Sequence, residues 1–285
     1  MTCLVTGATG FVGHALLPRL AERDEVVALG RRTPGSAEDV HWVRQDLTDP
    51  LDESVLPDRI DAVIHLAQSE RYRDFPDGAG DMMDVNLAST VRLLDYCHRA
   101  GGTSFVLAST GAIYAAGPRP VREEDPPRPG NFYAASKLAA EQVAAPYRAL
   151  LRVQVVRPFF VYGPGQQDNR FIPALLARIR AGRPVRLAGD DGIRLNPIYI
   201  DDAVELLLGA LDLETSETLN LAGPDVHSIR EIAQMIAAEA GANPSFDVAE
   251  VADDLVASIE RVSKRLGAPT VGMRKGLQRT VAAAR

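Results

Sequence analysis

The amino-acid sequence predicts an α/β fold of the Rossmann type, in which a doubly wound parallel sheet is followed by a smaller C-terminal lobe. Two observations predict this fold. Short apolar runs alternate with longer segments of helical period through the first two-thirds of the chain, and parallel strands need crossovers of that length. A glycine-rich turn also joins the first apolar run to the first helical segment. Together these features indicate successive β-α-β units.

The elements of the sheet follow one another in a regular order. The expected strands are the short apolar runs Cys3–Thr6, Glu25–Leu29, Ala62–Leu66, Ser104–Ala108 and Gln154–Pro158. The expected helices in the gaps are Val12–Glu22, Met83–Arg99 and Tyr133–Ala145. Because strand-helix-strand crossovers are right-handed, these helices should cover both faces of the sheet.

The composition changes after about Gly163, where loops rich in Gly, Pro and Asp appear. Between these loops the expected helices are Ile172–Ala181, Asp202–Ala210 and Ser228–Ala240. The last of them begins with a capping box, because Glu231 follows Ser228 by three residues. We therefore expect a first domain over residues 1–163 and a lobe formed mainly by residues 164–285. Two segments could instead return to the main sheet, Leu187–Asn196 and Leu219–Ala222.

Composition excludes several classes of protein. The formal net charge of −7 over 285 residues gives no basic field for nucleic acid or for an anionic membrane. No apolar run reaches the length of a membrane span, and the N-terminus does not resemble a signal peptide, so we expect a cytoplasmic protein. Cys3 and Cys97 lack the paired spacing of a zinc site and the histidines are scattered, so no metal is expected.

The glycine-rich turn has the spacing of a dinucleotide-binding turn. Gly7 allows the tight turn, Gly10 lets the backbone approach a pyrophosphate, and Gly13 lets helix and strand pack closely. The expected helix starts at Val12, directly after Phe11, and directs its N-terminus at the phosphate charge. The position of the turn, directly after the first strand, is the context that this motif requires.

The end of the second strand bears on which dinucleotide is bound. Gly30 stands about where an acidic residue would bind the ribose 2′-hydroxyl of NAD, and Arg31 and Arg32 follow it. Two arginines without an opposing carboxylate favour the 2′-phosphate of NADP, while NAD stays open if both are solvated surface residues. Asp46 is placed to meet the adenine; the alternative is a turn or cap residue.

A tyrosine and a lysine stand one helical turn apart. Tyr133 and Lys137 are four residues apart on an expected helix, and only three of the 31 Lys and Arg residues are lysines. A nearby ammonium lowers the pKa of a phenol, which makes Tyr133 usable as an acid or base in hydride transfer. The strand Ser104–Ala108 brings Ser109 and Thr110 to the carboxyl edge of the sheet, where a hydroxyl could hold the substrate oxygen.

Nearly the whole chain resembles the extended short-chain dehydrogenase/reductase family, within its NAD-dependent epimerase/dehydratase group. The matching segments are Thr6–Gly13, Asp46-Leu47, His65-Leu66-Ala67, Asn86, Ser109-Thr110, Tyr133–Lys137, Arg157-Pro158, Tyr162–Gly165 and Tyr199–Asp202.

The resemblance implies a role for each site residue. Tyr133 would be the acid/base, Lys137 would hold the nicotinamide ribose and tune Tyr133, and Thr110 would bind the reacting oxygen with Ser109 in a secondary place. Asn86 would lie near the cofactor. The resemblance also implies cofactor contacts from Leu47, Leu66, Ala67, Gln68 and Pro158. It suggests a homodimer formed through the helices that carry Asn86 and Tyr133.

Departures from the family pattern narrow the range of activities that the sequence predicts. Dehydratases carry an acidic pair directly after the threonine, where this chain has Gly111 and Ala112, so dehydration is disfavoured. Phe160 and Leu195 stand where sugar-nucleotide epimerases usually have Asn and Arg. The candidate substrate contacts are Ser109, Phe160, Arg170 and Arg194, the last displaced by one position from the family arginine.

These observations predict a hydride-transfer enzyme, most simply an NAD(P)-dependent reductase of a keto group on a sugar or similar polyhydroxylated substrate. The first alternative is a nucleotide-sugar epimerase that retains NAD. The second is a non-catalytic NADP-sensing protein, which would not need Thr110, Tyr133 and Lys137 together. The first domain would then bind the nucleotide and carry the catalytic pair, and the C-terminal lobe would bind the substrate.

Overall fold

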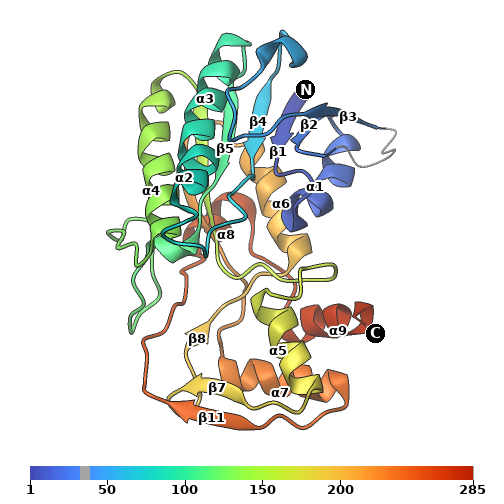
Figure 1. Cartoon of the computed structure of the whole chain (residues 1–285), viewed down its shortest axis with the longest axis vertical. Coiled ribbons are helices and arrows are strands. Elements are labelled where there is room, and N and C mark those ends of the chain that lie inside the picture. The colour runs from blue at the N-terminus through green and yellow to red at the C-terminus, as the bar shows by residue number, and fades with distance from the viewer. Residues whose placement is uncertain (33–38, 285) are drawn as a thin grey trace. The chain divides into compact units, whose positions relative to one another are not determined.

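A computed structural model describes residues 1–32 and 39–284. Its main feature is a seven-stranded sheet in the order β3-β2-β1-β4-β5-β6-β9 (Figure 1). The strands are β1 (Thr2–Thr6), β2 (Glu25–Gly30), β3 (Val40–Arg44), β4 (Ala62–His65), β5 (Ser104–Ala108), β6 (Arg152–Pro158) and β9 (Thr218–Leu221). Every pairing from β3 through β6 is parallel. The strand order reverses between β1 and β4, as in doubly wound nucleotide-binding sheets, so the predicted Rossmann fold is confirmed.

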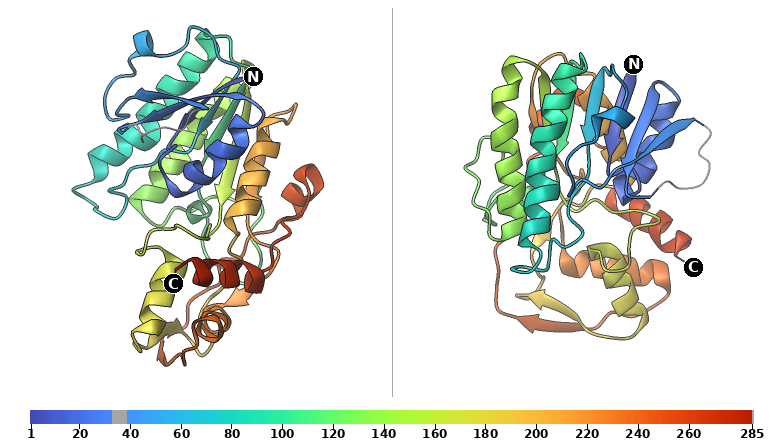
Figure 2. Two further views of the ribbon diagram at one scale, coloured as in Figure 1. Left: turned by 90° about the vertical axis from the view of Figure 1, so that its right-hand side faces the viewer. Right: turned by 45° about the horizontal axis from the view of Figure 1, so that its top comes forward.

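Helices cover both faces of this sheet, which explains why its central strands are mostly apolar and buried along nearly their whole length. The helices are α1 (Phe11–Ala21), α2 (Ala79–Met82), α3 (Ser89–Arg99) and α4 (Phe132–Ala144). α3 and α4 lie side by side on one face and α1 lies on the other (Figure 2). Leu93, Leu94 and Phe105 belong to the hydrophobic core between α3, α4 and the sheet, and none of them is exposed to solvent.

The chain divides into two compact units, each discontinuous in sequence. Unit 1 comprises residues 1–114, 126–157 and 207–219, and unit 2 comprises residues 115–125, 158–206 and 220–285. Within unit 2, two small sheets pair β7 with β11 in parallel and β8 with β10 in antiparallel. The remaining elements are α5 (Phe171–Arg180), β7 (Val185–Ala188), β8 (Arg194–Leu195), α6 (Ile200–Leu211), β10 (His227–Ser228), α7 (Ile229–Ala240), β11 (Phe246–Ala249), α8 (Glu260–Leu266) and α9 (Met273–Ala283). α6 and β9 each contribute residues to both units.

The structure resolves the two segments that could return to the main sheet. Leu219–Ala222 does so, because β9 lies beside β6. Leu187–Asn196 does not: β7 and β8 pair with β11 and β10 in the small sheets of unit 2. The capping box at the start of α7 is confirmed, since Ser228 Oγ accepts from the Glu231 N–H at 3.1 Å and Glu231 Oε2 accepts from the Ser228 N–H at 2.8 Å.

Two further elements differ from expectation. β3 is absent from the strands expected from the sequence, because it is an edge strand in which only Val43 is buried and its apolar run is short. The helix expected over Met83–Arg99 begins earlier, at Ala79, and contains a π-helical stretch over Met83–Ala88. In the described part of the chain, no helix is both long and apolar enough to cross a membrane.

Candidate active site

The glycine-rich turn between β1 and α1 is packed too tightly for larger residues. Gly7 has a φ of +68°, and a Cβ there would lie 2.7 Å from the Ala67 nitrogen. A Cβ on Gly13 would lie 2.3 Å from the Gly7 oxygen. Gly10 is the N-cap of α1, so the N–H groups of the first helical turn have no carbonyl within the helix to bond. This cradle of backbone N–H groups at a helix N-terminus fits the pyrophosphate of a dinucleotide.

Residues that follow three neighbouring strands lie at one edge of the sheet. β1, β4 and β5 are adjacent and parallel, so their carboxyl ends share that edge. Gly7 follows β1, Gln68 comes three residues after β4, and Thr110 comes two residues after β5. Ligands of doubly wound sheets bind outside this edge, at the point where the strand order reverses.

A buried histidine at the end of β4 holds this edge together. His65 is not exposed at all, and its Nδ1 lies 2.6 Å from Thr6 Oγ1. His65 Nε2 lies 3.1 Å from Thr90 Oγ1. Because Thr90 donates its only hydroxyl hydrogen to the Asn86 carbonyl, Thr90 Oγ1 must accept the hydrogen bond from His65 Nε2. His65 is therefore neutral with its proton on Nε2, and burial lowers its pKa to about 3.

We expect the buried His65 to make the protein less stable as the pH falls. Its pKa is about 3 in the folded state and 6.5 ordinarily, so between these values the unfolded chain binds more protons. The free energy of unfolding should therefore drop below about pH 6.5, by up to about 1.4 kcal/mol per pH unit. Denaturant titrations at a series of pH values measure this slope.

His65→Asn should flatten the slope just below neutrality, whereas His98→Asn, at an exposed position of α3, should leave it unchanged. An unaltered slope in His65→Asn would assign the acid sensitivity to other groups.

Asn86 connects the segment after β4 to the helix that carries the catalytic candidates. Its Oδ1 accepts from the Ser69 N–H at 2.9 Å, and its Nδ2 donates to Ser136 Oγ at 2.9 Å. Ser136 in turn donates to the Tyr133 carbonyl at 2.8 Å. Asn86 is fully buried within the π-helical stretch, a geometry frequent at functional sites. Its expected place near a cofactor stays a prediction, since these bonds alone explain its burial.

Tyr133 and Lys137 lie on one face of α4, in different surroundings. Asn131 caps the helix by accepting from the Ala134 N–H at 2.9 Å, which places the half-buried Tyr133 in the first turn. The Tyr133 hydroxyl donates to Gln68 Oε1 at 2.8 Å. Lys137, one turn on, is 1% exposed, and burial lowers its pKa to about 8 against the opposing effect of Glu141. A phenol and a readily titrating amine thus stand one turn apart.

Glu141 extends this face by another turn and anchors a buried ion pair that was not predicted from the sequence. It binds Arg157 of β6 through two contacts, Nη2 to Oε2 at 2.6 Å and Nε to Oε1 at 3.0 Å, with both side chains 9% exposed. Arg157 Nη1 also donates to the Tyr114 hydroxyl. The signal was present in the sequence, because Glu141 follows Lys137 by four residues as Lys137 follows Tyr133.

The two hydroxyl residues after β5 are used differently. Thr110 caps a short 3₁₀ helix over Gly111–Ile113, and its Oγ1 accepts from the Ala112 N–H at 3.1 Å, so its own hydrogen can still be donated. Ser109 is buried and donates its hydroxyl hydrogen to Glu141. The secondary substrate role expected of Ser109 therefore competes with a structural one, which makes Thr110 the stronger candidate.

Two of the expected cofactor contacts, Arg31 and Asp46, already have protein partners. Arg31 Nη2 lies 2.5 Å from Glu70 Oε1, an ion pair between two exposed side chains. Asp46 Oδ1 accepts from the N–H and hydroxyl of Thr48, at 3.0 and 2.9 Å, and the backbone bond lowers the pKa of Asp46. Asp46 thus makes the turn that was its alternative interpretation, and contact with adenine stays a prediction.

The expected substrate contacts of the C-terminal lobe belong to unit 2. Phe160 has a φ of +47°, which is uncommon for a bulky residue, and its ring lies 5.7 Å from that of Phe171. Asn tolerates this backbone conformation better than Phe does, which agrees with the asparagine usual here in epimerases. Arg170 is the N-cap of α5, next to Phe171, whereas Arg194 lies apart on β8. Pro158 ends β6.

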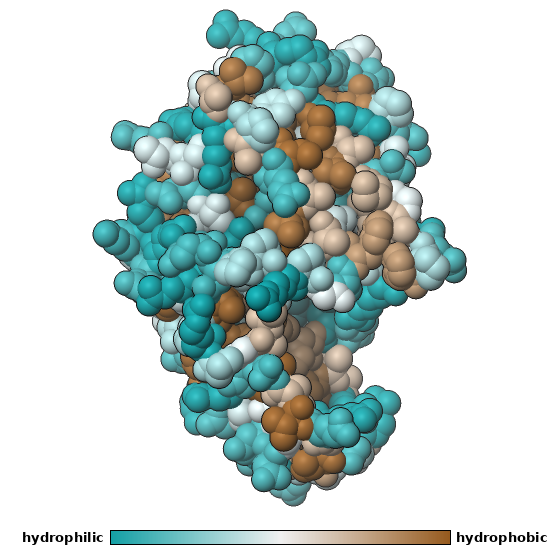
Figure 3. All heavy atoms as spheres, turned by 90° about the vertical axis from the view of Figure 1, so that its left-hand side faces the viewer, coloured by the Kyte–Doolittle hydropathy of each residue, from teal (hydrophilic) through white to brown (hydrophobic). Residues whose placement is uncertain are grey.

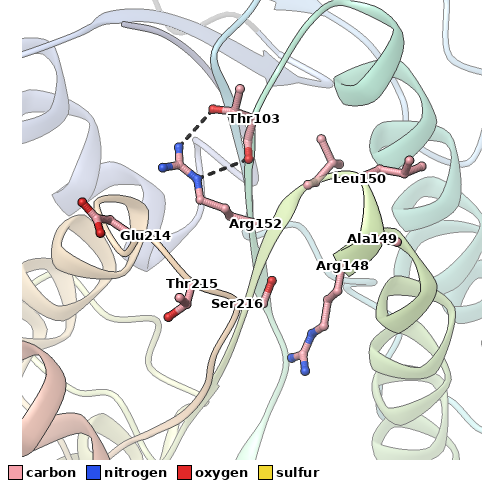
Figure 4. Close-up of a pocket in the computed structure, with 9 residues that line it drawn as sticks. Thr103, Arg148, Ala149, Leu150, Arg152, Glu214, Thr215 and Ser216 are labelled. Atoms are coloured by element: carbon pink, nitrogen blue, oxygen red, sulfur yellow. Dashed lines mark hydrogen bonds between the residues drawn. The ribbon is translucent and has the colours of Figure 1, made fainter.

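A shallow groove of about 700 Å³ lies at the opposite edge of the sheet, where β5 and β6 begin (Figure 4). It is lined by Thr103 and by residues 148–152 and 214–216. Its arginines are held by neighbours: Arg152 Nη2 donates to Thr103 Oγ1 and Arg148 Nη2 donates to Thr218 Oγ1, each at 3.0 Å. The groove is far along the strands from the carboxyl ends where Tyr133 and Thr110 gather.

Within residues 1–32 and 39–284, no cluster of three or more His, Cys, Asp or Glu side chains is suited to a metal ion. Cys3 and Cys97 are free and buried, and burial raises the pKa of each thiol to about 12.

Comparison with known proteins identifies the family of the chain. Residues 3–222 match the NAD dependent epimerase/dehydratase family. The chain is 31% identical to a dTDP-4-dehydro-6-deoxy-D-allose reductase of a Streptomyces species, over 98% of this chain and 94% of that one. It is 30% identical to a UDP-glucose 4-epimerase of Mycolicibacterium smegmatis, over 99% and 97% of the two chains. Among solved structures, MoeE5 in complex with UDP-glucuronic acid and NAD superposes with a TM-score of 0.88 at 29% identity, over 100% and 99%. The chain therefore belongs to the NAD dependent epimerase/dehydratase family of enzymes, as its sequence motifs predict.

Proposed function

We propose that this enzyme reduces a keto group on a sugar, and that the sugar is carried on a nucleoside diphosphate. The observation that carries the proposal is the line of side chains on α4, with the half-buried Tyr133 hydroxyl one turn from the buried Lys137. The substrate class comes from the relatives, a reductase and an epimerase whose names specify dTDP- and UDP-linked sugars.

In the proposed mechanism Thr110 and Tyr133 hydrogen-bond the substrate oxygen, and Tyr133 gives it a proton as the carbon is reduced. The Lys137 ammonium stabilises the phenolate that remains. A bound nicotinamide dinucleotide would supply the hydride. Most of the rate enhancement would come from positioning and from charges already in place.

The proposed cofactor contacts come from the ends of strands and the segments that follow them, and from helical segments, among them those that carry Asn86 and Tyr133. The glycine turn would hold the pyrophosphate, and Lys137 the nicotinamide ribose. The full set is Gly7, Gly10, Phe11, Val12, Gly13, Arg31, Arg32, Asp46, Leu47, Leu66, Ala67, Gln68, Asn86, Tyr133, Lys137 and Pro158. The proposed substrate contacts beyond Thr110 are Ser109, Phe160, Arg170 and Arg194.

The second candidate function is epimerisation with a retained cofactor. It is favoured by the solved structures, since MoeE5 and a UDP-glucuronic acid 4-epimerase of Bacillus cereus both contain NAD. An epimerase oxidises one carbon and reduces it again from the other face, so the same tyrosine serves as base and then as acid.

One experiment separates the two functions. Any nicotinamide bound to the purified protein is released and identified, and oxidation of NADPH and NADH is followed over free and nucleotide-linked keto-sugars. Net oxidation of added cofactor by initially empty protein supports the reductase. Tightly held NAD with no net oxidation, but with interconversion of sugar epimers, supports the epimerase.

NADP is the cofactor that we propose, because β2 ends at Gly30, with no carboxylate at that end of the strand, and Arg31 follows. A 2′-phosphate would take Arg31 from Glu70, its exposed partner. We expect Arg31→Ala to lower kcat/KM for NADPH roughly tenfold to a hundredfold, as for the loss of one charged hydrogen bond, and to leave NADH unchanged.

Glu70→Gln should raise kcat/KM for NADPH, because it frees Arg31. Arg19→Ala, near the end of α1, is the control for the loss of one positive charge. If Arg31→Ala affects both cofactors equally or neither, Arg31 does not bind the 2′-phosphate.

A homodimer through α3 and α4 is part of the proposal. Val91 on α3 and Met83 just before it are large apolar side chains that are 38% and 40% exposed. Figure 3 shows hydrophobic residues among hydrophilic ones on the face of unit 1 where α4 lies. Sedimentation should give twice the mass of the chain, and Val91→Glu should reduce it to the mass of one chain.

We also place the enzyme in the cytoplasm, where its two free cysteines stay reduced.

A further inference from the structure

The segment that follows β4 holds both the hydroxyl and the ring of Tyr133. The hydroxyl donates to Gln68 Oε1 at 2.8 Å. Four residues after Gln68, the ring of Tyr72 packs with its centre 5.5 Å from that of Tyr133. The family resemblance implies only a cofactor contact for Gln68, so its bond to the proposed acid/base is a second role.

The fold fixes the backbone on either side of Gln68. The Ala67 N–H donates to Thr6 Oγ1 at 3.3 Å, and the Ser69 N–H donates to Asn86 Oδ1 at 2.9 Å. Asn86 also holds α4 through Ser136, so one buried amide sets the positions of both partners. These backbone and side-chain hydrogen bonds therefore place the half-buried Gln68 side chain against Tyr133.

A primary amide suits a group that changes its protonation state. A phenol can donate a hydrogen bond as well as accept one, whereas a phenolate can only accept. Gln68 carries a carbonyl oxygen that accepts and an NH₂ group that donates, and rotation about its terminal torsion exchanges them. A carboxylate at this position could partner only the phenol, and an ammonium could not accept the hydrogen of the phenol.

We infer that Gln68 is a positioning residue for Tyr133 that partners both protonation states, with its carbonyl oxygen on the phenol and its NH₂ group on the phenolate. This inference rests on the proposed function, because it takes Tyr133 as the proton donor. The substrate carbon gains a hydride, which a reduced nicotinamide dinucleotide would supply, and the substrate oxygen takes the Tyr133 proton. Solvent later restores that proton. Gln68 exchanges no proton in either step.

The test uses Gln68→Glu and Gln68→Met in the whole chain. Gln142→Glu, which adds the same charge at an exposed position of α4, is the matched control. The pKa of Tyr133 is read from ultraviolet phenolate absorbance, as the difference between each protein and the same protein carrying Tyr133→Phe. The pH dependence of kcat and KM is measured in parallel, and circular dichroism verifies folding.

Gln68→Glu should raise the pKa of Tyr133 by about one pH unit or more, because a carboxylate disfavours the phenolate. The pH limb of kcat assigned to Tyr133 should move with it. Gln68→Met removes a partner from both states, so the pKa should stay within about half a pH unit while kcat falls roughly tenfold and KM changes little. Gln142→Glu should match the wild type.

Two results would overturn the inference. If Gln68 only accepts, Gln68→Met lowers the pKa of Tyr133; if it does not engage Tyr133, Gln68→Glu leaves that pKa unchanged. The titration needs no turnover, so it separates this inference from the proposed function. A shifted pKa without activity on any keto-sugar would reject the function alone, whereas activity lost in Tyr133→Phe with an unchanged pKa in Gln68→Glu would reject the inference alone.

Discussion

Replacing Tyr133 with phenylalanine should lower kcat by roughly 10²-fold to 10⁴-fold, the usual contribution of a positioned proton donor. The substitution removes only the hydroxyl, which contacts Gln68, and keeps the ring that packs on Tyr72. Folding and cofactor affinity should therefore stay close to those of the wild type. Steady-state kinetics with the best keto-sugar, together with cofactor titration by fluorescence, measure both quantities.

The control is Tyr147→Phe, which removes a hydroxyl from the residue just beyond the opposite end of α4 and should leave kcat unchanged. Full activity in Tyr133→Phe would mean that another group protonates the substrate oxygen. Thr110→Val then becomes the informative variant, because Thr110 is the other hydroxyl expected at that oxygen.

The parts of the fold that could be predicted are those with local signals. The glycine turn, the apolar runs of β1, β4 and β5, and the capping box of α7 all depend on residues close together in the chain. β3 was missed because an edge strand with one buried residue has almost no apolar run. The sheet that Leu187–Asn196 joins could not be predicted for a related reason, because the sequence of a short apolar strand does not indicate its pairing partner.

The same distinction applies to the site. Tyr133 and Lys137 were found because helical spacing places them on one face, and Glu141 could have been found by extending that spacing. The partner of the Tyr133 hydroxyl could not, because Gln68 is 65 residues away and the contact depends on bonds from Thr6 and Asn86 to its neighbours. The ion pair of Arg31 with Glu70 is likewise a long-range contact, and it changes how the cofactor preference must be tested.

Replacing Arg157 with methionine should lower the free energy of unfolding by about 3–5 kcal/mol, because it leaves the Glu141 carboxylate buried without its cation. The long apolar side chain of methionine fills much of the same space, so the loss reports mainly on charge. Arg152→Met, on the same strand, removes a guanidinium that bonds only Thr103 within the described part of the chain and should stay within about 1 kcal/mol of wild type. Denaturant unfolding measures all three proteins.

The pH dependence of the stability loss in Arg157→Met shows whether an uncompensated charge or lost packing causes it. Without Arg157, the buried site holds a carboxylate charge that has lost its guanidinium partner, so the stability penalty is largest in alkaline solution, where carboxylates are ionised. The difference in free energy of unfolding between Arg157→Met and the wild type should shrink from alkaline to acidic solution. A difference that does not change with pH would indicate lost packing instead.

The double variant Arg157→Met with Glu141→Gln should recover most of the stability, because the glutamine amide keeps an acceptor for Ser109 and carries no charge. The pKa of Lys137 should also be lower in this variant, because the Glu141 carboxylate opposes the lowering of that pKa by burial. A stable double variant whose activity requires a more acidic solution would therefore show that Glu141 both supports the fold and sets the charge of Lys137.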